Sequence, residues 1–188
     1  FDRIEAGTFV IAGALIAKKL KIVSLQTEII KNELKILKKM NVRLKIKKNE
    51  VIIFKSRNIK PIKIKTEPYP GFPTDLQAQI MVLMTRANGF SKIKENIFEN
   101  RFMHVPELNR MGAKIKVFGN LSKISGIKNL NGAEVMATDL RASVSLVLAG
   151  LIAKNRTIIN RVYHLDRGYE NLENKLRKCG ANIFRTKY

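Results

Sequence analysis

Three apolar stretches recur along the chain between lysine-rich segments, at residues 8–18, 74–86 and 138–153. Each is longer than an ordinary strand of about four to eight residues, so the pattern predicts a helix in each place. The second and third stretches open with matching pentapeptides, Thr-Asp-Leu-Gln-Ala from residue 74 and Thr-Asp-Leu-Arg-Ala from residue 138. The match indicates a repeated structural unit.

The matching openings also predict how two of these helices begin. Thr74 and Thr138 precede an apolar run, where a threonine hydroxyl can cap the helix by accepting a bond from a free backbone N–H. Asp75 and Asp139 would then lie at the positive end of a helix dipole, which favours an ionised carboxylate. We therefore expect these aspartates and Arg141 to face a common cleft.

A second pattern repeats three times, at residues 37–42, 108–113 and 176–181. Each copy reads as a helix that ends at Asn41, Gly112 or Gly180, because these residue types tolerate the left-handed conformation of a helix C-cap. An alternating strand is predicted after each copy, most clearly at residues 42–47. Further strands are predicted at residues 21–23, 51–54 and 62–65.

Together the patterns predict one domain of three helix–strand–helix–strand units, at residues 1–66, 67–132 and 133–188. The apolar helices would be buried together with the sheets outside them, which is an α+β fold. Residues 67–73 contain three prolines and a glycine and predict a stiff, extended segment. That segment is either a rigid crossover between repeats or a device that aims Asp75 into a cleft.

The chain is strongly basic, with 36 lysines and arginines against 15 acidic residues, a net charge of +21 and a pI near 10.3. Such a charge predicts an anionic partner: nucleic acid, a membrane surface or phosphorylated small molecules. A general coding bias also explains it, because lysines occur in nearly every segment. With 7% aromatic residues and no tryptophan, stacking on bases is disfavoured, and the longest apolar stretch, residues 142–153, is too short to span a bilayer.

The single cysteine excludes an internal disulfide and predicts a reducing compartment, the cytoplasm. Cys179 occupies the place of Met40 and Met111 in the repeats, so we expect a small buried hydrophobic side chain. We expect His104 and His164 to be structural hydrogen-bonding residues, and we expect no metal site and no cofactor. The chain lacks an initiator methionine and reads as a piece of a longer protein or a processed product.

Four polar segments contain groups that core packing does not require, at residues 72–75, 99–104, 139–141 and 164–170. Their arginines suit bidentate binding of carboxylate or phosphate. An aspartate beside a substrate hydroxyl can act as a base or orient that group. Taken singly, each segment is also explained by a solvated ion pair or a helix cap.

These segments resemble the UDP-N-acetylglucosamine 1-carboxyvinyltransferases, a family of enolpyruvyl transferases. The most specific stretches are FPTDLQAQ (72–79), FENRFMHVPEL (98–108), ATDLRAS (137–143) and YHLDRGYE (163–170). The resemblance covers nearly the whole chain, from residue 2 to residue 183. It implies the enolpyruvyl transferase fold, an inside-out α/β barrel (α/β prism) of three repeats. It also implies that this chain is the C-terminal of two domains, with the N-terminal domain absent.

The resemblance implies a reaction, the transfer of enolpyruvyl from phosphoenolpyruvate to the 3-hydroxyl of UDP-N-acetylglucosamine, which is the first committed step of peptidoglycan synthesis. Asp75 would be the base on that hydroxyl, and Asp139 would lie beside the reacting centre. Arg141 and Arg167 would grip phosphoenolpyruvate or the released phosphate. The resemblance also implies residues that bind substrate or support the site, namely Thr74, the Ile97 backbone, Glu99 and Arg101. It implies that Glu5 acts at a hinge.

Parts of the family pattern are missing or altered. The reaction needs a general acid that protonates the methylene of phosphoenolpyruvate. In the family this acid is usually a cysteine on a mobile loop of the N-terminal domain, so it falls outside this chain. A lysine and an asparagine that family members contribute from near their N-terminus are absent too. Tyr69 stands where a histidine is expected, which puts local substrate contacts in doubt. The implied partners are the two substrates and the missing domain, without nucleic acid or membrane. Two alternatives stay open: an inactive remnant with the same fold, and a basic nucleic-acid-binding module.

Overall fold

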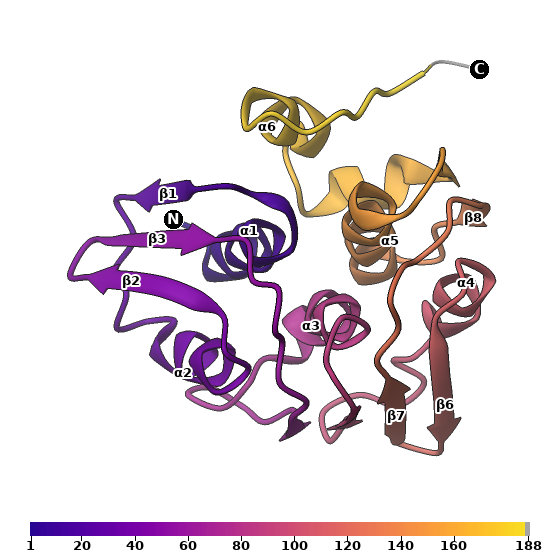
Figure 1. Ribbon diagram of the computed structural model, residues 1–188, viewed down its shortest axis with the longest axis horizontal. Coiled ribbons are helices and arrows are strands. Elements are labelled where there is room, and N and C mark those ends of the chain that lie inside the picture. The colour runs from indigo at the N-terminus through magenta and orange to yellow at the C-terminus, as the bar shows by residue number, and fades with distance from the viewer. Residues whose placement is uncertain (187–188) are drawn as a thin grey trace.

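Three helices lie at the centre of the molecule in the computed structural model, which describes residues 1–186 (Figure 1). They are α1 (Arg3–Ile16), α3 (Gln77–Met84) and α5 (Leu140–Ile152), and a 3₁₀ turn, η1 (Thr74–Leu76), leads into α3. The three predicted apolar helices are confirmed, although α1 begins before its predicted start. The Asp2 side chain caps α1 by accepting bonds from the N–H groups of Ile4 and Glu5.

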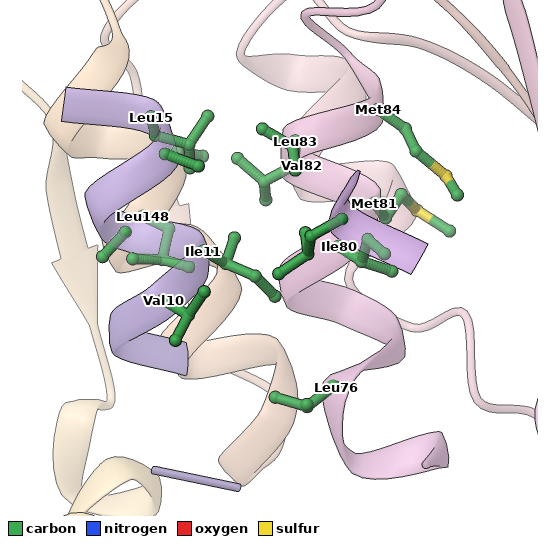
Figure 2. Packing of buried hydrophobic residues seen from close by; sticks show 14 of the residues in the cluster. Val10, Ile11, Leu15, Leu76, Ile80, Met81, Val82, Leu83, Met84 and Leu148 are labelled. Atoms are coloured by element: carbon green, nitrogen blue, oxygen red, sulfur yellow. The ribbon is translucent and has the colours of Figure 1, made fainter. Parts of the chain in front are cut away.

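The core lies where these helices meet, and most of it is aliphatic (Figure 2). Val10 of α1, Ile80 of α3 and Leu148 of α5 are at most 1% exposed. All of α3 is buried, because α1 and α5 flank it and one of the sheets contacts it as well, so its sequence needs no polar face. A Cβ on Gly7 would lie 2.5 Å from Leu76 Cδ1, so a glycine is what lets α1 approach η1.

Three separate sheets surround the helices. The first is antiparallel with the order β1-β3-β2, the second has the order β4-β5-β7-β6, and the third pairs β8 with β9. The strands are β1 (Leu20–Val23), β2 (Arg43–Lys47), β3 (Glu50–Phe54), β4 (Lys63–Lys65), β5 (Phe90–Lys94), β6 (Lys114–Phe118), β7 (Leu121–Ser125), β8 (Glu134–Met136) and β9 (Ile158–Asn160). The strands predicted at residues 21–23, 42–47, 51–54 and 62–65 are therefore confirmed to within a residue or two.

One strand joins two consecutive repeats. β4 comes from the first repeat but pairs in parallel with β5 of the second, whereas β8 and β9, which also pair in parallel, both lie within residues 133–188. The strand register also aligns lysines across the second sheet, since Lys92 is opposite both Lys63 and Lys123, and Lys123 is opposite Lys116. Much of the positive charge thus lies on outward sheet faces.

The architecture is mixed α+β. Within residues 1–186, no strand of one sheet pairs with a strand of another sheet, so a closed barrel is not visible. In the same part of the chain, no helix combines the length and the apolar character needed to cross a bilayer.

Three outer helices end as the sequence predicts. They are α2 (Lys31–Lys39), α4 (Val105–Arg110) and α6 (Leu172–Lys178). Asn41, Gly112 and Gly180 follow them with φ of 65°, 89° and 92°, the left-handed conformation of a helix C-cap. The strands β2 and β6 begin soon after the first two helices, but no strand is formed at residues 181–186.

The third copy departs from the pattern at Cys179, which is exposed, so the prediction of a buried side chain is wrong. Met40 and Met111, at the matching positions, are fully buried. There the chain returns after a hairpin, and Lys60 and Asn131 donate backbone bonds to the carbonyls of Met40 and Met111. Within residues 1–186 no such returning segment covers α6, which lies at the outer end of the molecule in Figure 1.

Candidate active site

Asp75 lies in η1, between two arginines from different parts of the chain. Its Oδ1 accepts a bond of 2.8 Å from Arg101 Nη2 and one of 3.1 Å from Arg141 Nε. Arg101 comes from the turn after β5, whereas Arg141 is the second residue of α5. The three side chains are 35%, 26% and 19% exposed, so the cluster is sheltered but open to solvent. Among the described residues, no hydrogen bond to Asp75 Oδ2 is found, so this second oxygen is available to a ligand.

The start of α5 is capped by an aspartate and not by a threonine. Asp139 Oδ1 accepts bonds of 2.7 and 2.9 Å from the N–H groups of Arg141 and Ala142. The predicted caps at Thr74 and Thr138 are therefore wrong, because η1 begins without a side-chain cap and a carboxylate takes the capping position in α5. The cap therefore holds the Asp139 carboxylate against the Arg141 backbone at the start of the helix.

The proline-rich linker folds back on itself and does not run extended, which corrects the prediction for residues 67–73. The Glu67 N–H donates to the Phe72 carbonyl at 3.0 Å, and the Gly71 N–H donates to the Pro68 carbonyl at 2.7 Å. A Cβ on Gly71 would lie 2.4 Å from Glu67 Cβ, so this tight loop requires glycine. Phe72 is buried at its end, and the loop thereby anchors η1, which contains Asp75.

A buried carboxylate that the sequence did not single out organises the other side of the site. Glu95, 2% exposed, accepts bonds from the hydroxyls of Thr66 and Thr74 at 2.7 and 3.0 Å. It also accepts bonds from the N–H groups of Ile97 and Phe98 at 2.9 and 3.2 Å. Glu95 thus ties η1 to the turn that follows β5. A single acidic residue at the end of a lysine-rich strand gave no signal for this role.

The turn after β5 holds three of the implied substrate residues in different settings. The Ile97 N–H is already used by Glu95, so only its carbonyl is available to a ligand. Glu99 is exposed, and no hydrogen bond or ion pair is found for it within residues 1–186. The Arg101 guanidinium lies 5.1 Å from the centre of the Phe98 ring, which helps to hold it toward Asp75.

Two further candidates lie apart from Asp75. Arg167 is exposed at the end of the 3₁₀ segment η2 (Val162–Arg167), and it makes no ion pair with the described residues. The next residue, Gly168, is packed so closely on Leu140 that a Cβ would lie 2.6 Å from Leu140 Cδ2, which places this segment against the start of α5. Glu5 accepts a 2.7 Å bond from Lys175 Nζ and so ties α1 to α6.

The structure therefore brings Asp75, Arg101 and Arg141 into direct contact, with Asp139 at the same helix start. Arg167 lies on the neighbouring segment with its guanidinium free, and Glu5 takes part in a different ion pair. Tyr69, the altered position, is 60% exposed beneath the Arg3 guanidinium, 5.1 Å from the ring centre. Within residues 1–186 no group of three or more His, Cys, Asp or Glu side chains is placed to hold a metal ion.

His104 is buried behind the cluster. Burial is the main cause that lowers the pKa of His104 to about 4, while the charge of Asp139 opposes this shift and that of Arg101 adds to it. The Nε2 atom of His104 and the Nδ1 atom of His164 have no hydrogen-bond partner among the described residues, contrary to the predicted hydrogen-bonding role. The His164 ring packs on Tyr163, with the ring centres 4.3 Å apart.

Burial of neutral His104 makes stability depend on pH. The unfolded chain protonates this histidine near pH 6.5, whereas the folded chain does so only near pH 4, so stability is lost as the pH falls between these values. We expect a loss of about 2 kcal/mol from pH 6.5 to pH 5, and His104→Leu should largely abolish it. Urea unfolding at both pH values measures the difference. His164→Gln is the control, and an equal loss in His104→Leu would contradict the assignment.

The sequence profile described as EPSP synthase (3-phosphoshikimate 1-carboxyvinyltransferase) matches residues 1–176. The chain belongs to the EPSP synthase family. Within this family, a UDP-N-acetylglucosamine 1-carboxyvinyltransferase from Pelagibacter ubique is 61% identical over 184 residues, which is 98% of this chain and 44% of that protein.

Solved structures agree with membership of the EPSP synthase family. The enolpyruvyl transferase NikO from Streptomyces tendae matches with a TM-score of 0.90 and 31% identity, over 97% of this chain and 44% of that one. EPSP synthase from Acinetobacter baumannii matches with a TM-score of 0.63 and 16% identity, over 84% of this chain and 38% of that one, which shows the fold alone. The chain thus spans less than half the length of these relatives.

Proposed function

We propose that this chain is the C-terminal part of a cytoplasmic UDP-N-acetylglucosamine 1-carboxyvinyltransferase that carries out the first committed step of peptidoglycan synthesis. The name of the Pelagibacter ubique relative supports the choice of substrates. The observation that supports it most is the Asp75 carboxylate held by Arg101 and Arg141, with one oxygen left open. In the proposal, the N-terminal domain closes over this face and completes the site.

The proposed reaction is an addition followed by an elimination. The 3-hydroxyl oxygen of the sugar forms a bond to C2 of phosphoenolpyruvate, its proton passes to Asp75 Oδ2, and an acid protonates the C3 methylene. C3 then loses a proton, the C2–O bond to phosphate breaks, and inorganic phosphate leaves. Asp75 supplies the base in the first step. The acid is not in this chain and belongs to the N-terminal domain in the proposal, and no cofactor takes part.

The arginines would hold the anionic substrate. Arg141 uses Nε on Asp75, and its remaining N–H donors are suited to a bidentate contact with phosphate or carboxylate. Arg167 offers a whole guanidinium on the segment packed against the start of α5. Fixed cations at this place stabilise the charge that develops on the departing phosphate. Asp139, which caps α5, keeps the Arg141 backbone in place.

The nucleotide sugar would bind along the turn after β5. Its contacts in the proposal are the Ile97 carbonyl, Glu99 and Thr74, with Arg101 between the turn and Asp75. Glu5, bonded to Lys175, would act at the hinge between the domains.

The two alternative functions, an inactive remnant and a nucleic-acid-binding module, predict different results from the transferase. In an inactive remnant the contact of Asp75 with two arginines would be an ion pair that only supports the fold, and Asp75→Asn would not change turnover. A nucleic-acid-binding module is favoured by the aligned lysines of the second sheet, but these lie on outward sheet faces and not beside Asp75. We therefore retain the transferase as the proposed function and leave nucleic-acid binding as an outcome of the test.

The test uses a protein in which this chain is joined to the part of the Pelagibacter ubique relative that the chain does not match. We call this protein the fusion. We expect phosphate release that requires both phosphoenolpyruvate and UDP-N-acetylglucosamine, at a rate within about tenfold of the intact relative, since 61% identity preserves most packing. The chain without its partner should release none. A folded fusion without phosphate release, or one that instead binds duplex DNA tightly at physiological salt, would reject the proposal.

A further inference from the structure

Three polar side chains meet where the three central helices come together. The hydroxyls of Thr8 and Tyr169 are 2.8 Å apart, and Gln79 Nε2 donates to them at 3.2 and 3.3 Å. Thr8 and Tyr169 are each 2% exposed and Gln79 is fully buried. The three residues come from the first, second and third repeats, in α1, α3 and the segment after η2. We call them the junction cluster.

The junction cluster connects directly to Asp75 and, through Asp75, to Arg141. Gln79 Nε2 also donates to the Asp75 backbone carbonyl at 2.9 Å, and the Asp75 carboxylate accepts the 3.1 Å bond from Arg141 Nε. Burial raises the pKa of the Tyr169 hydroxyl, whereas the bond to Thr8 and the positive charge of Arg141 lower it. The charge of Arg141 thus acts on the junction cluster as well as on Asp75.

Gln79 links the two hydroxyls to Asp75. Its Nε2 atom has two protons for three acceptors, which are the Thr8 and Tyr169 hydroxyls and the Asp75 carbonyl. Either hydroxyl can be the donor in the 2.8 Å contact between Thr8 and Tyr169. Loss of one hydroxyl therefore leaves the other without this partner and changes which acceptors orient the Gln79 amide.

The position of the cluster argues against a role in stability alone. The surrounding helix faces are aliphatic, and apolar side chains of similar size would pack there without any need for hydrogen bonds. We propose that Thr8, Gln79 and Tyr169 are positioning residues, which hold Asp75 and Arg141 in the arrangement that the proposed transferase reaction needs. This inference rests on the proposed function for its kinetic part, whereas its geometric part stands independently.

The test uses the fusion with Tyr169→Phe, Thr8→Val and Thr8→Ser. Phenylalanine and valine fill the same space without the hydroxyl, and serine restores it. We expect kcat to fall by roughly 10- to 100-fold in Tyr169→Phe and Thr8→Val, with the KM values within about twofold and with recovery in Thr8→Ser. Thr85→Val is the matched control, because Thr85 is a buried threonine whose hydroxyl donates to the Val82 carbonyl of its own helix at 2.7 Å, away from Asp75.

A crystal structure of the Tyr169→Phe fusion gives a readout that does not need turnover. We expect Arg141 Nε to leave hydrogen-bond distance of Asp75 Oδ1, which is 3.1 Å in the unmodified chain. Arg141 unmoved in Tyr169→Phe would overturn the inference, even if the unmodified fusion proved inactive and the proposed function failed. In an active fusion, an unchanged kcat in Tyr169→Phe, or a fall of equal size in Thr85→Val, would also overturn it.

Discussion

Asp75→Asn is expected to lower phosphate release by the fusion by about 1,000-fold, within the range of general base catalysis. The amide has the shape of the carboxylate and can still accept a bond from Arg101 or Arg141 at Oδ1, but it cannot take the proton of a sugar hydroxyl. The fold should persist, because Asp75 is partly exposed and outside the apolar core. Steady-state phosphate release measures the effect, and circular dichroism confirms the fold.

Glu50→Gln is the matched control for this variant. Glu50 is also a carboxylate between two cations, Lys21 and Lys47, at 2.7 and 2.9 Å, but it lies on strand β3 of the first sheet. We expect its turnover to equal that of the unmodified fusion. Near-normal turnover in Asp75→Asn would remove Asp75 from the role of base, whereas an equal loss in both variants would mean that charge and not position is responsible.

Glu95→Gln is expected to have the largest effect on stability among single-atom changes near the site. The Glu95 carboxylate accepts four bonds from Thr66, Thr74, Ile97 and Phe98. An amide offers one acceptor oxygen, which can keep the three bonds now made to Oε1, but these bonds lose the charge of the carboxylate. The NH₂ group would face the Thr74 hydroxyl, which must then reverse its bond and accept. We expect a loss of about 2–4 kcal/mol in the free energy of unfolding, measured by urea titration.

The same substitution should act on substrate binding. Because Glu95 ties η1 to the turn that contains Ile97, loosening it should raise the KM for UDP-N-acetylglucosamine more than the KM for phosphoenolpyruvate. Glu28→Gln is the control, since Glu28 is an exposed carboxylate whose ion pair is with Lys31. An unfolding free energy in Glu95→Gln equal to that of the control would contradict the organising role of Glu95.

Local patterns in the sequence predicted the elements of the fold well. The apolar runs in α1, α3 and α5, and the left-handed caps at Asn41 and Gly112, depend on neighbouring residues in the chain, so local physics determines them. The prediction for Cys179 is wrong because its burial depends on a segment that returns to cover α6, and residues 181–186 provide none. Repeats in sequence therefore do not ensure equal surroundings.

The site was predictable only in part. The matching pentapeptides drew attention to Asp75 and Arg141, but the threonine caps were wrong, since a carboxylate displaced one and Glu95 engaged the other. Glu95 and the junction cluster were missed because their bonds join residues far apart in the chain, such as Thr8 and Tyr169. One local sign of the cluster was available: Gln79 is a polar residue within an apolar helix.

The most direct measurement is a crystal structure of the fusion with UDP-N-acetylglucosamine bound. We predict that the sugar 3-hydroxyl lies within about 3 Å of Asp75 Oδ2, with Arg141 Nε still at Oδ1. A sugar whose 3-hydroxyl is remote from Asp75 would contradict the account, whatever the activity of the fusion.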